Sequence, residues 1–184
     1  GYGHDDRVCS YASVNALLSI DEIPEYTCCC LLADKEEIGS VGATGMSAKY
    51  FENAVAELLN ASGSYSELVL RRALAACRML SCDVSAAYEP NFAGAFARKN
   101  SAYLGRGVCF NKYTGSRGKS GSNDANAEFC GRLRTIMYDA GVNFQTSELG
   151  KVDQGGGGTI AKYMANRNID TIDAGVPVMS MHSP

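Results

Sequence analysis

The spacing of apolar residues changes along the chain and predicts helices and strands in turn. Segment 6–19 has Val8, Tyr11 and Leu18 spaced for one face of a helix. Pro24 ends anything helical before the next element. The continuous apolar run at 26–33, which contains three adjacent cysteines, is typical of a short buried strand.

The rest of the chain continues this alternation. Further helices are predicted over 47–59, 67–77, 122–140 and 159–167, and further strands over 79–84, 108–113, 142–146, 169–174 and 176–181. Residues 85–106 are predicted to be irregular, and 114–121 to be a loop. This order predicts an α/β fold with a mixed, largely parallel sheet sandwiched by helices, in one compact unit without internal repeats.

Composition narrows the range of partners. The 184 residues are 46% hydrophobic, which fits one domain with a sizeable core. A net charge of −3 gives no electrostatic case for binding nucleic acid or an anionic membrane surface. No apolar run approaches the roughly 20 residues of a membrane helix. The eight cysteines lack zinc-finger spacing, so we expect reduced core thiols in a cytoplasmic protein.

Acidic residues and one histidine stand at the ends of predicted elements. Ligands of open α/β sheets bind beyond the carboxyl ends of the strands, so these positions are candidates for chemistry. They are Asp5, Asp6, Asp34, Glu36, Glu37, Asp83 and His182. Carboxylate oxygens and imidazole nitrogens suit a divalent metal, and of two adjacent glutamates one can bind the metal while the other accepts a proton.

Each of these groups also has a plainer explanation. The acidic pair at 5–6 could only complement a helix dipole, and the pair at 36–37 could be solvated loop charge. His182 could be a hydrogen-bonded core residue. Asp83 is harder to explain in this way, because it lies near the end of an apolar strand, where an unpaired carboxylate is costly. The joint placement of these residues favours a metal site.

Six short motifs, in order over nearly the whole chain, resemble the aspartyl aminopeptidase family of dinuclear zinc metallopeptidases. They are DDRV at 5–8, DKEEIGS at 34–40, CDVS at 82–85, SNDA at 122–125, DQGGGGT at 153–159 and GVPVMSMHS at 175–183. The resemblance implies a zinc-peptidase-like α/β fold, incomplete in these residues. It also implies hydrolysis of the N-terminal residue of a peptide.

The resemblance implies a role for each site residue. Asp6 is expected to bridge two zinc ions, for which cobalt or manganese could substitute. Glu36 is expected to be the general base. Glu37 and His182 would bind one zinc, and Asp83 the other.

Three further residues are predicted to contact substrate. The glycine run at 155–158 lacks the Gly-Lys-Ser/Thr ending of a phosphate-binding loop. We therefore expect the backbone of this run to approach a peptide substrate or the metal site, with Gly156 and Gly157 as the substrate-contacting positions. Lys112 could bind an acidic side chain of the substrate, or could belong to a solvated basic loop. A preference for acidic N-terminal residues stays open.

The resemblance also sets expectations about organisation. The chain is expected to be the C-terminal portion of a catalytic domain. One more metal ligand, in a His-x-Asp motif, and a dimerisation domain would lie upstream of these residues. The partners would be a peptide with a free amino terminus and copies of the same chain, typically in a tetrahedral dodecamer. The alternatives are a related zinc hydrolase, of glutamyl aminopeptidase or deacylase type, and a non-catalytic structural homologue.

Overall fold

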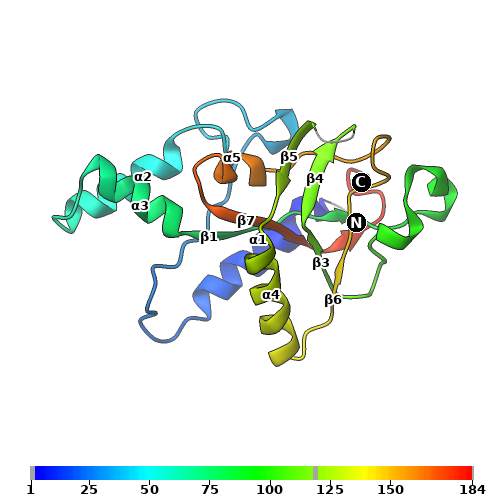
Figure 1. Cartoon of the computed structure of the whole chain (residues 1–184), viewed down its shortest axis with the longest axis horizontal. Helices are drawn as coiled ribbons and strands as arrows, with labels where there is room; N and C mark the ends of the chain where they lie inside the picture. Colours follow the sequence, from blue (N-terminus) through cyan, green and yellow to red (C-terminus); the bar gives the residue numbers. More distant parts are fainter. Residues whose placement is uncertain (1–2, 118–119, 184) are drawn as a thin grey trace.

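The structure is a computed structural model that describes residues 3–117 and 120–183 (Figure 1). Its α-helices are α1 (His4–Leu18), α2 (Tyr50–Ala61), α3 (Glu67–Ala76), α4 (Ala127–Asp139) and α5 (Ala161–Ala165). Its strands are β1 (Arg78–Ser81), β2 (Ser85–Ala86), β3 (Val108–Asn111), β4 (Tyr113–Ser116), β5 (Ser120–Asp124), β6 (Phe144–Thr146), β7 (Asp170–Gly175) and β8 (Pro177–Val178). The described residues also form the 3₁₀ turns η1 (Glu36–Ile38), η2 (Pro90–Ala95) and η3 (Arg98–Asn100).

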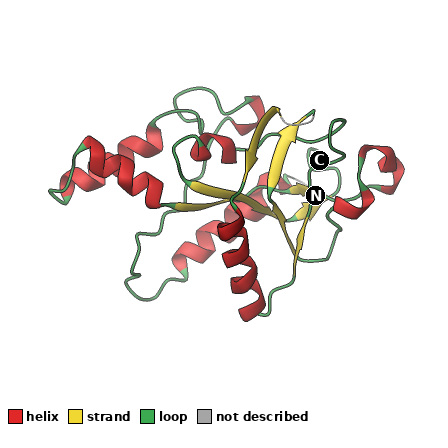
Figure 2. Ribbon diagram, viewed as in Figure 1, coloured by secondary structure: helices red, strands yellow, loops and turns green. Residues whose placement is uncertain are grey.

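A four-stranded sheet in the order β1-β7-β3-β6 lies at the centre (Figure 2). The outer pairs, β1 with β7 and β3 with β6, are parallel, and the central pair of β3 with β7 is antiparallel. β2 and β8 form a short parallel pair, and β4 and β5 form an antiparallel hairpin. The predicted mixed, largely parallel sheet is therefore confirmed.

Helices pack on both sides of this sheet, as predicted. On one face, Phe129 and Leu133 of α4 pack against Phe110 and Ile172 of the central strands. In Figure 1, α5 lies across β7 on the side opposite α4. Met164 of α5 belongs to a second core cluster with side chains from α3. The burial of these apolar side chains holds the layers together.

The predicted strand at 26–33 is wrong, because these residues form no strand in the structure. Leu31 and Ala33 pack against the second core cluster, whereas Tyr26 and Leu32 are 72% and 60% exposed. The side chains at 31–33 thus alternate as in a strand. The backbone has no neighbouring strand within the described residues, and an apolar run alone cannot supply one.

The predicted loop at 114–121 is also wrong where it is described, because β4 and β5 form a hairpin over much of it. Residues 118–119 lie outside the described residues. The hairpin moves the start of the following helix to 127, where Asn126 is the N-cap and its side chain accepts a hydrogen bond from the Phe129 amide. Glycine and serine content indicated a turn but not the strands that flank it.

The eight cysteines are free, and their predicted burial is only partly correct. Cys9 and Cys109 are buried, but Cys28 and Cys29 are exposed. The exposed pair lies in the segment that failed to form a strand. Across the described ranges 3–117 and 120–183, no helix is long and apolar enough to cross a membrane.

Gly175, the last residue of β7, lets the backbone of Asp83 approach β7 closely. A Cβ atom at Gly175 would lie 1.5 Å from the carbonyl oxygen of Asp83. That distance is far inside van der Waals contact, so only glycine fits unless one backbone moves. The segment between β1 and β2 therefore crosses directly over the end of β7.

We predict that Gly175→Ala lowers the free energy of unfolding by about 3 kcal/mol, because the methyl group forces two backbones apart. Denaturant unfolding measures this. Gly131→Ala is the matched control, since a Cβ atom at this position in α4 meets nothing within 4 Å and alanine favours a helix. Equal stability of the two variants would contradict the packing argument.

Candidate metal centre

The head of α1 places two adjacent carboxylates. Asp5 and Asp6 have non-helical backbone angles although they lie within the helix bounds, and the peptide bond between them is cis. One turn later, Cys9 is buried in a small core cluster with Val84 and Val178. This packing fixes the start of α1 against the segment after β1 and against β8.

The turn η1 presents the two glutamates Glu36 and Glu37. Lys35 before the turn and Gly39 after it both have positive φ angles. The amide of Gly39 donates to the carbonyl of Glu36 at 2.9 Å, and the amide of Ser40 donates to that of Lys35 at 2.7 Å. These bonds close the turn tightly.

Four of the carboxylates and a histidine converge in two groups of three. In one group, the ligand atoms of Asp5, Glu37 and His182 all lie within 4.8 Å of one another. The other group joins Asp5, Asp6 and Asp83 within the same distance. Nε2 of His182 lies 3.0 Å from Oδ2 of Asp5 and 3.3 Å from Oε1 of Glu37.

The structure therefore brings together the four residues predicted as metal ligands, Asp6, Glu37, Asp83 and His182. It adds Asp5, which the sequence argument did not place among the ligands, and Asp5 alone of these belongs to both groups. The doubled aspartate was the available signal. Only backbone geometry decides which of two adjacent side chains points where.

Burial and like charge make this cluster electrostatically strained. Burial, followed by the nearby carboxylates of Glu36, Asp5, Asp6 and Asp173, raises the pKa of Asp83 to about 8. Burial first, and then Glu37, also raises the pKa of Glu36, although His182 acts in the opposite direction.

The pKa of Asp6 is also raised. Burial raises the pKa of its carboxyl, whereas hydrogen bonding from Cys9 lowers it. Oδ1 of Asp6 is buried and has no hydrogen-bond partner among the described residues. A cation would satisfy this atom.

The donor set fits zinc. Carboxylate oxygens and an imidazole nitrogen are ordinary zinc ligands, with bonds near 2 Å. Two ligands of one ion then lie about 3–4 Å apart, a range that small side-chain movements within each group can reach. The orphaned oxygen of Asp6 and the raised pKa of Asp83 both indicate that the folded chain alone does not stabilise the charged form of these carboxylates, which a cation would do.

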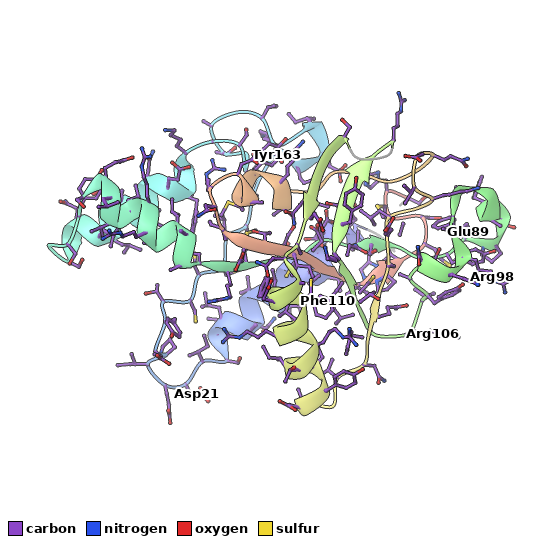
Figure 3. All side chains as sticks on the ribbon, in the orientation of Figure 1. Asp21, Glu89, Arg98, Arg106, Phe110 and Tyr163 are labelled. Carbon is purple, nitrogen blue, oxygen red and sulfur yellow. The ribbon has the colours of Figure 1, made fainter. Side chains whose placement is uncertain are left out.

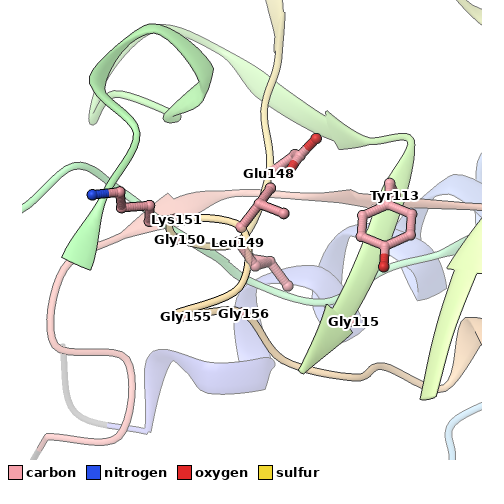
Figure 4. Close-up of a pocket in the computed structure, with 9 residues that line it drawn as sticks. Tyr113, Gly115, Glu148, Leu149, Gly150, Lys151, Gly155 and Gly156 are labelled. Carbon is pink, nitrogen blue, oxygen red and sulfur yellow. The ribbon is translucent and has the colours of Figure 1, made fainter. Parts of the chain in front are cut away.

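The three residues predicted to contact substrate belong to neither ligand group. Lys112 forms an ion pair with Asp124 of β5. A Cβ atom at Gly156 would lie 2.1 Å from the carbonyl oxygen of Gly115, so this glycine lets its loop pack on β4. Figure 4 shows the small pocket beside that packing, lined by residues that include Gly156, Tyr113 and Lys151. A Cβ atom at Gly157 would meet nothing within 4 Å. Their roles toward a substrate stay predictions.

Asp173, which the sequence argument did not single out, is a buried carboxylate close to the cluster. It lies in β7, is 2% exposed, and neither carboxylate oxygen has a hydrogen-bond partner among the described residues. Burial raises its pKa, while the nearby hydroxyls of Ser81, Thr159 and Thr114 act in the opposite direction. An aspartate inside the predicted strand 169–174 was the signal in the sequence.

The mixed α/β fold and the cluster of carboxylates and a histidine suit a zinc-dependent peptidase, and comparison with known proteins gives the family. The model of the family described as "Aminopeptidase I zinc metalloprotease (M18)" matches residues 1–184. The chain belongs to this family. It is the aspartyl aminopeptidase family, which the six sequence motifs of the chain already resembled.

Relatives agree with this assignment. The chain is 55% identical over 184 residues to the "Probable M18 family aminopeptidase 1" of Clostridium acetobutylicum, and 46% identical to that of Thermotoga maritima. All of this chain is matched in both, but only 39% and 40% of those proteins. The chain thus spans about two-fifths of the length of these relatives.

Solved structures show the same fold. Aminopeptidase I from Clostridium acetobutylicum has a TM-score of 0.89 and 54% identity over 100% of this chain and 39% of its own. The M18 aminopeptidase from Thermotoga maritima has a TM-score of 0.86 and 42% identity, over 99% of this chain and 40% of its own. The mApe1 dodecamer of Saccharomyces cerevisiae shares the fold, with a TM-score of 0.72. It is 23% identical over 98% of this chain and 39% of its own.

We predict that Asp173→Asn raises the melting temperature at pH 7 and gives no gain near pH 3. The raised pKa means that the folded chain binds this proton more tightly than the unfolded chain. Wild-type stability therefore falls as the pH rises above about 4, the ordinary pKa of an aspartate. Asparagine does not ionise, so the variant does not lose this stability.

Thermal melts of chelator-treated protein across this pH range make the measurement, so that bound metal does not contribute. Asp21→Asn is the control, because Asp21 is an exposed aspartate (Figure 3). A pH-independent difference between Asp173→Asn and wild type would count against a buried charge.

Proposed function

We propose that the full-length protein is a zinc-dependent aminopeptidase that hydrolyses the N-terminal residue of peptides. The observation that carries this proposal is the pair of ligand groups that share Asp5, with Glu36 within electrostatic reach. Two such groups suit a two-ion site, which is a recurrent arrangement in aminopeptidases. The names of the relatives support the same reaction.

Two zinc ions are the proposed cofactors, with cobalt or manganese as substitutes. Asp5, Glu37 and His182 would hold one ion, and Asp6 and Asp83 would serve the other together with Asp5. We assign the bridging position to Asp5 in place of Asp6, because Asp5 belongs to both groups. Bound zinc would polarise the peptide carbonyl and make water a better nucleophile near neutral pH.

Glu36 is the proposed general base. Burial and neighbouring carboxylates raise its pKa, which brings the group closer to the range where a carboxylate exchanges protons readily. Glu36 takes a proton from the water that attacks the first peptide carbonyl. It then gives that proton to the leaving amine as the carbon–nitrogen bond breaks.

The proposed partners are a peptide with a free amino terminus and further copies of the chain. A homo-oligomer is supported by the shared fold with the dodecamer of Saccharomyces cerevisiae. We further propose that this oligomer is a tetrahedral dodecamer. We also propose a preference for acidic N-terminal residues, whose side chain would pair with Lys112 after the ion pair of Lys112 with Asp124 breaks. Eight free thiols favour a reducing compartment, so we propose a cytoplasmic location.

We predict that Glu36→Gln lowers kcat by a factor of about 10²–10⁴, because general-base catalysis contributes about that much, while the zinc content stays unchanged. Steady-state kinetics on free-amine peptides and elemental analysis measure the two quantities. N-blocked peptides run in parallel distinguish an aminopeptidase from a related deacylase. A near-normal kcat would exclude Glu36 as the base.

Glu37→Gln is the matched control for Glu36→Gln, because it makes the same change at the adjacent residue. It removes a carboxylate from one ligand group, so we expect a lower zinc content as well as lower activity. If both glutamine variants kept full zinc, the separation of base and ligand would be contradicted.

We predict that Asp5→Asn reduces the zinc stoichiometry more than Asp6→Asn does. Asp5 contributes to both ligand groups, whereas Asp6 contributes to one. Elemental analysis of dialysed protein gives the number of ions bound per chain. A greater loss in Asp6→Asn would return the bridging role to Asp6.

A further inference from the structure

The turn that carries Glu36 and Glu37 belongs to a loop that is closed on itself. The amide and hydroxyl of Ser47 both donate to the carbonyl of Ser40, at 3.2 and 2.5 Å. Ser40 is 2% exposed, and a Cβ atom at Gly45 would lie 2.3 Å from the same carbonyl oxygen. The two ends of the loop therefore pack around one backbone group.

A tyrosine from outside the loop holds the turn itself. The hydroxyl of Tyr163 donates to the carbonyl oxygen of Gly39 at 2.8 Å. Gly39 caps η1 and stands two residues after Glu37. Figure 3 labels Tyr163 on α5, on the side of the sheet opposite α4.

Arg167 fixes both Tyr163 and the exit of the loop. Its Nη1 donates to the carbonyl of Tyr163 at 2.6 Å, and its Nη2 donates to the carbonyls of Ser47 and Ala48 at 3.2 and 2.7 Å. Its Nε pairs with Glu52 of α2 at 2.5 Å, and the arginine side chain is only 12% exposed. All three nitrogens of the guanidinium group are thus engaged.

The helix that carries Tyr163, α5, packs against the core, and Arg167 follows two residues after its end. Ala161 and Met164 of α5 are 0% and 2% exposed, and Tyr163 packs against the cluster around Met164. Close packing of this kind leaves a helix little freedom to shift. A rigid path therefore leads from the core through Tyr163 to the turn.

We propose that Tyr163 is a positioning residue that sets the orientation of Glu36 through the carbonyl of Gly39, with Arg167 as the second anchor of the same loop. This inference rests on the proposed role of Glu36 as the base. A proton acceptor has to stay within hydrogen-bond reach of the water that it activates, so movement of η1 slows proton transfer. Tyr163→Phe removes the hydroxyl and keeps the packed ring.

The experiment compares Tyr163→Phe with Tyr103→Phe in the full-length protein. Tyr103 is the matched control, because its hydroxyl also donates to a backbone carbonyl, that of Arg98, at 2.9 Å. We expect Tyr163→Phe to lower kcat about fivefold, the effect of one hydrogen bond, with KM within about twofold of wild type. Tyr103→Phe should leave both constants unchanged.

A second background separates positioning from general weakening of the fold. With Glu36→Gln already in place, Tyr163→Phe should cause no further loss of kcat, because the group that it positions no longer acts as a base. The same fivefold loss in both backgrounds would overturn the proposal. So would an unchanged kcat in Tyr163→Phe alone.

Hydrogen exchange provides a readout that needs no activity. The amides of Gly39 and Ser40 close η1, and we expect them to exchange about fivefold faster in Tyr163→Phe and at the wild-type rate in Tyr103→Phe. Absence of peptidase activity in wild type would contradict the proposed function. Unchanged exchange at these two amides would instead overturn the proposed action of Tyr163.

Discussion

Mutual repulsion among the carboxylates at the head of α1 constrains every element around them. Asp5, Asp6 and Asp83 place ligand atoms within 4.8 Å of one another, and the pKa of Asp83 rises to about 8 under burial and its acidic neighbours. Such a cluster does not assemble on its own, because like charges in a half-buried place are costly. The surrounding fold has to hold these groups together, and a bound divalent cation would offset the cost.

Apolar packing and backbone contacts supply that restraint. Cys9, Val84 and Val178 join the helix, the segment after β1 and the short strand β8 in one small core. Gly175 lets the chain near Asp83 cross β7 at a distance that no other residue allows. On the opposite side, Tyr163 reaches the turn of the two glutamates from α5. The site is thus supported by elements that are far apart in the sequence.

Much of the fold could be predicted from the pattern of residues. The α/β class and the largely parallel sheet are confirmed, as are the helices near 67–76 and the strand near 170–175, because their periodicity is local. The strand at 26–33 was wrong, since a strand needs a neighbour that an apolar run does not specify. The β4–β5 hairpin was missed, because its glycine and serine residues do not distinguish a loop from a twisted ribbon.

The sequence by itself determined the chemical inventory of the site: adjacent aspartates, adjacent glutamates, Asp83 and His182 at the ends of elements. Residue type fixes which atoms can bind a metal or a proton. Only the tertiary structure decided that Asp5 belongs to both ligand groups, that the Asp173 carboxylate is buried without a hydrogen-bond partner among the described residues, and that Tyr163 holds the glutamate turn. Those facts depend on distances between segments more than a hundred residues apart or on the direction of one side chain, and neither is a local property of the sequence.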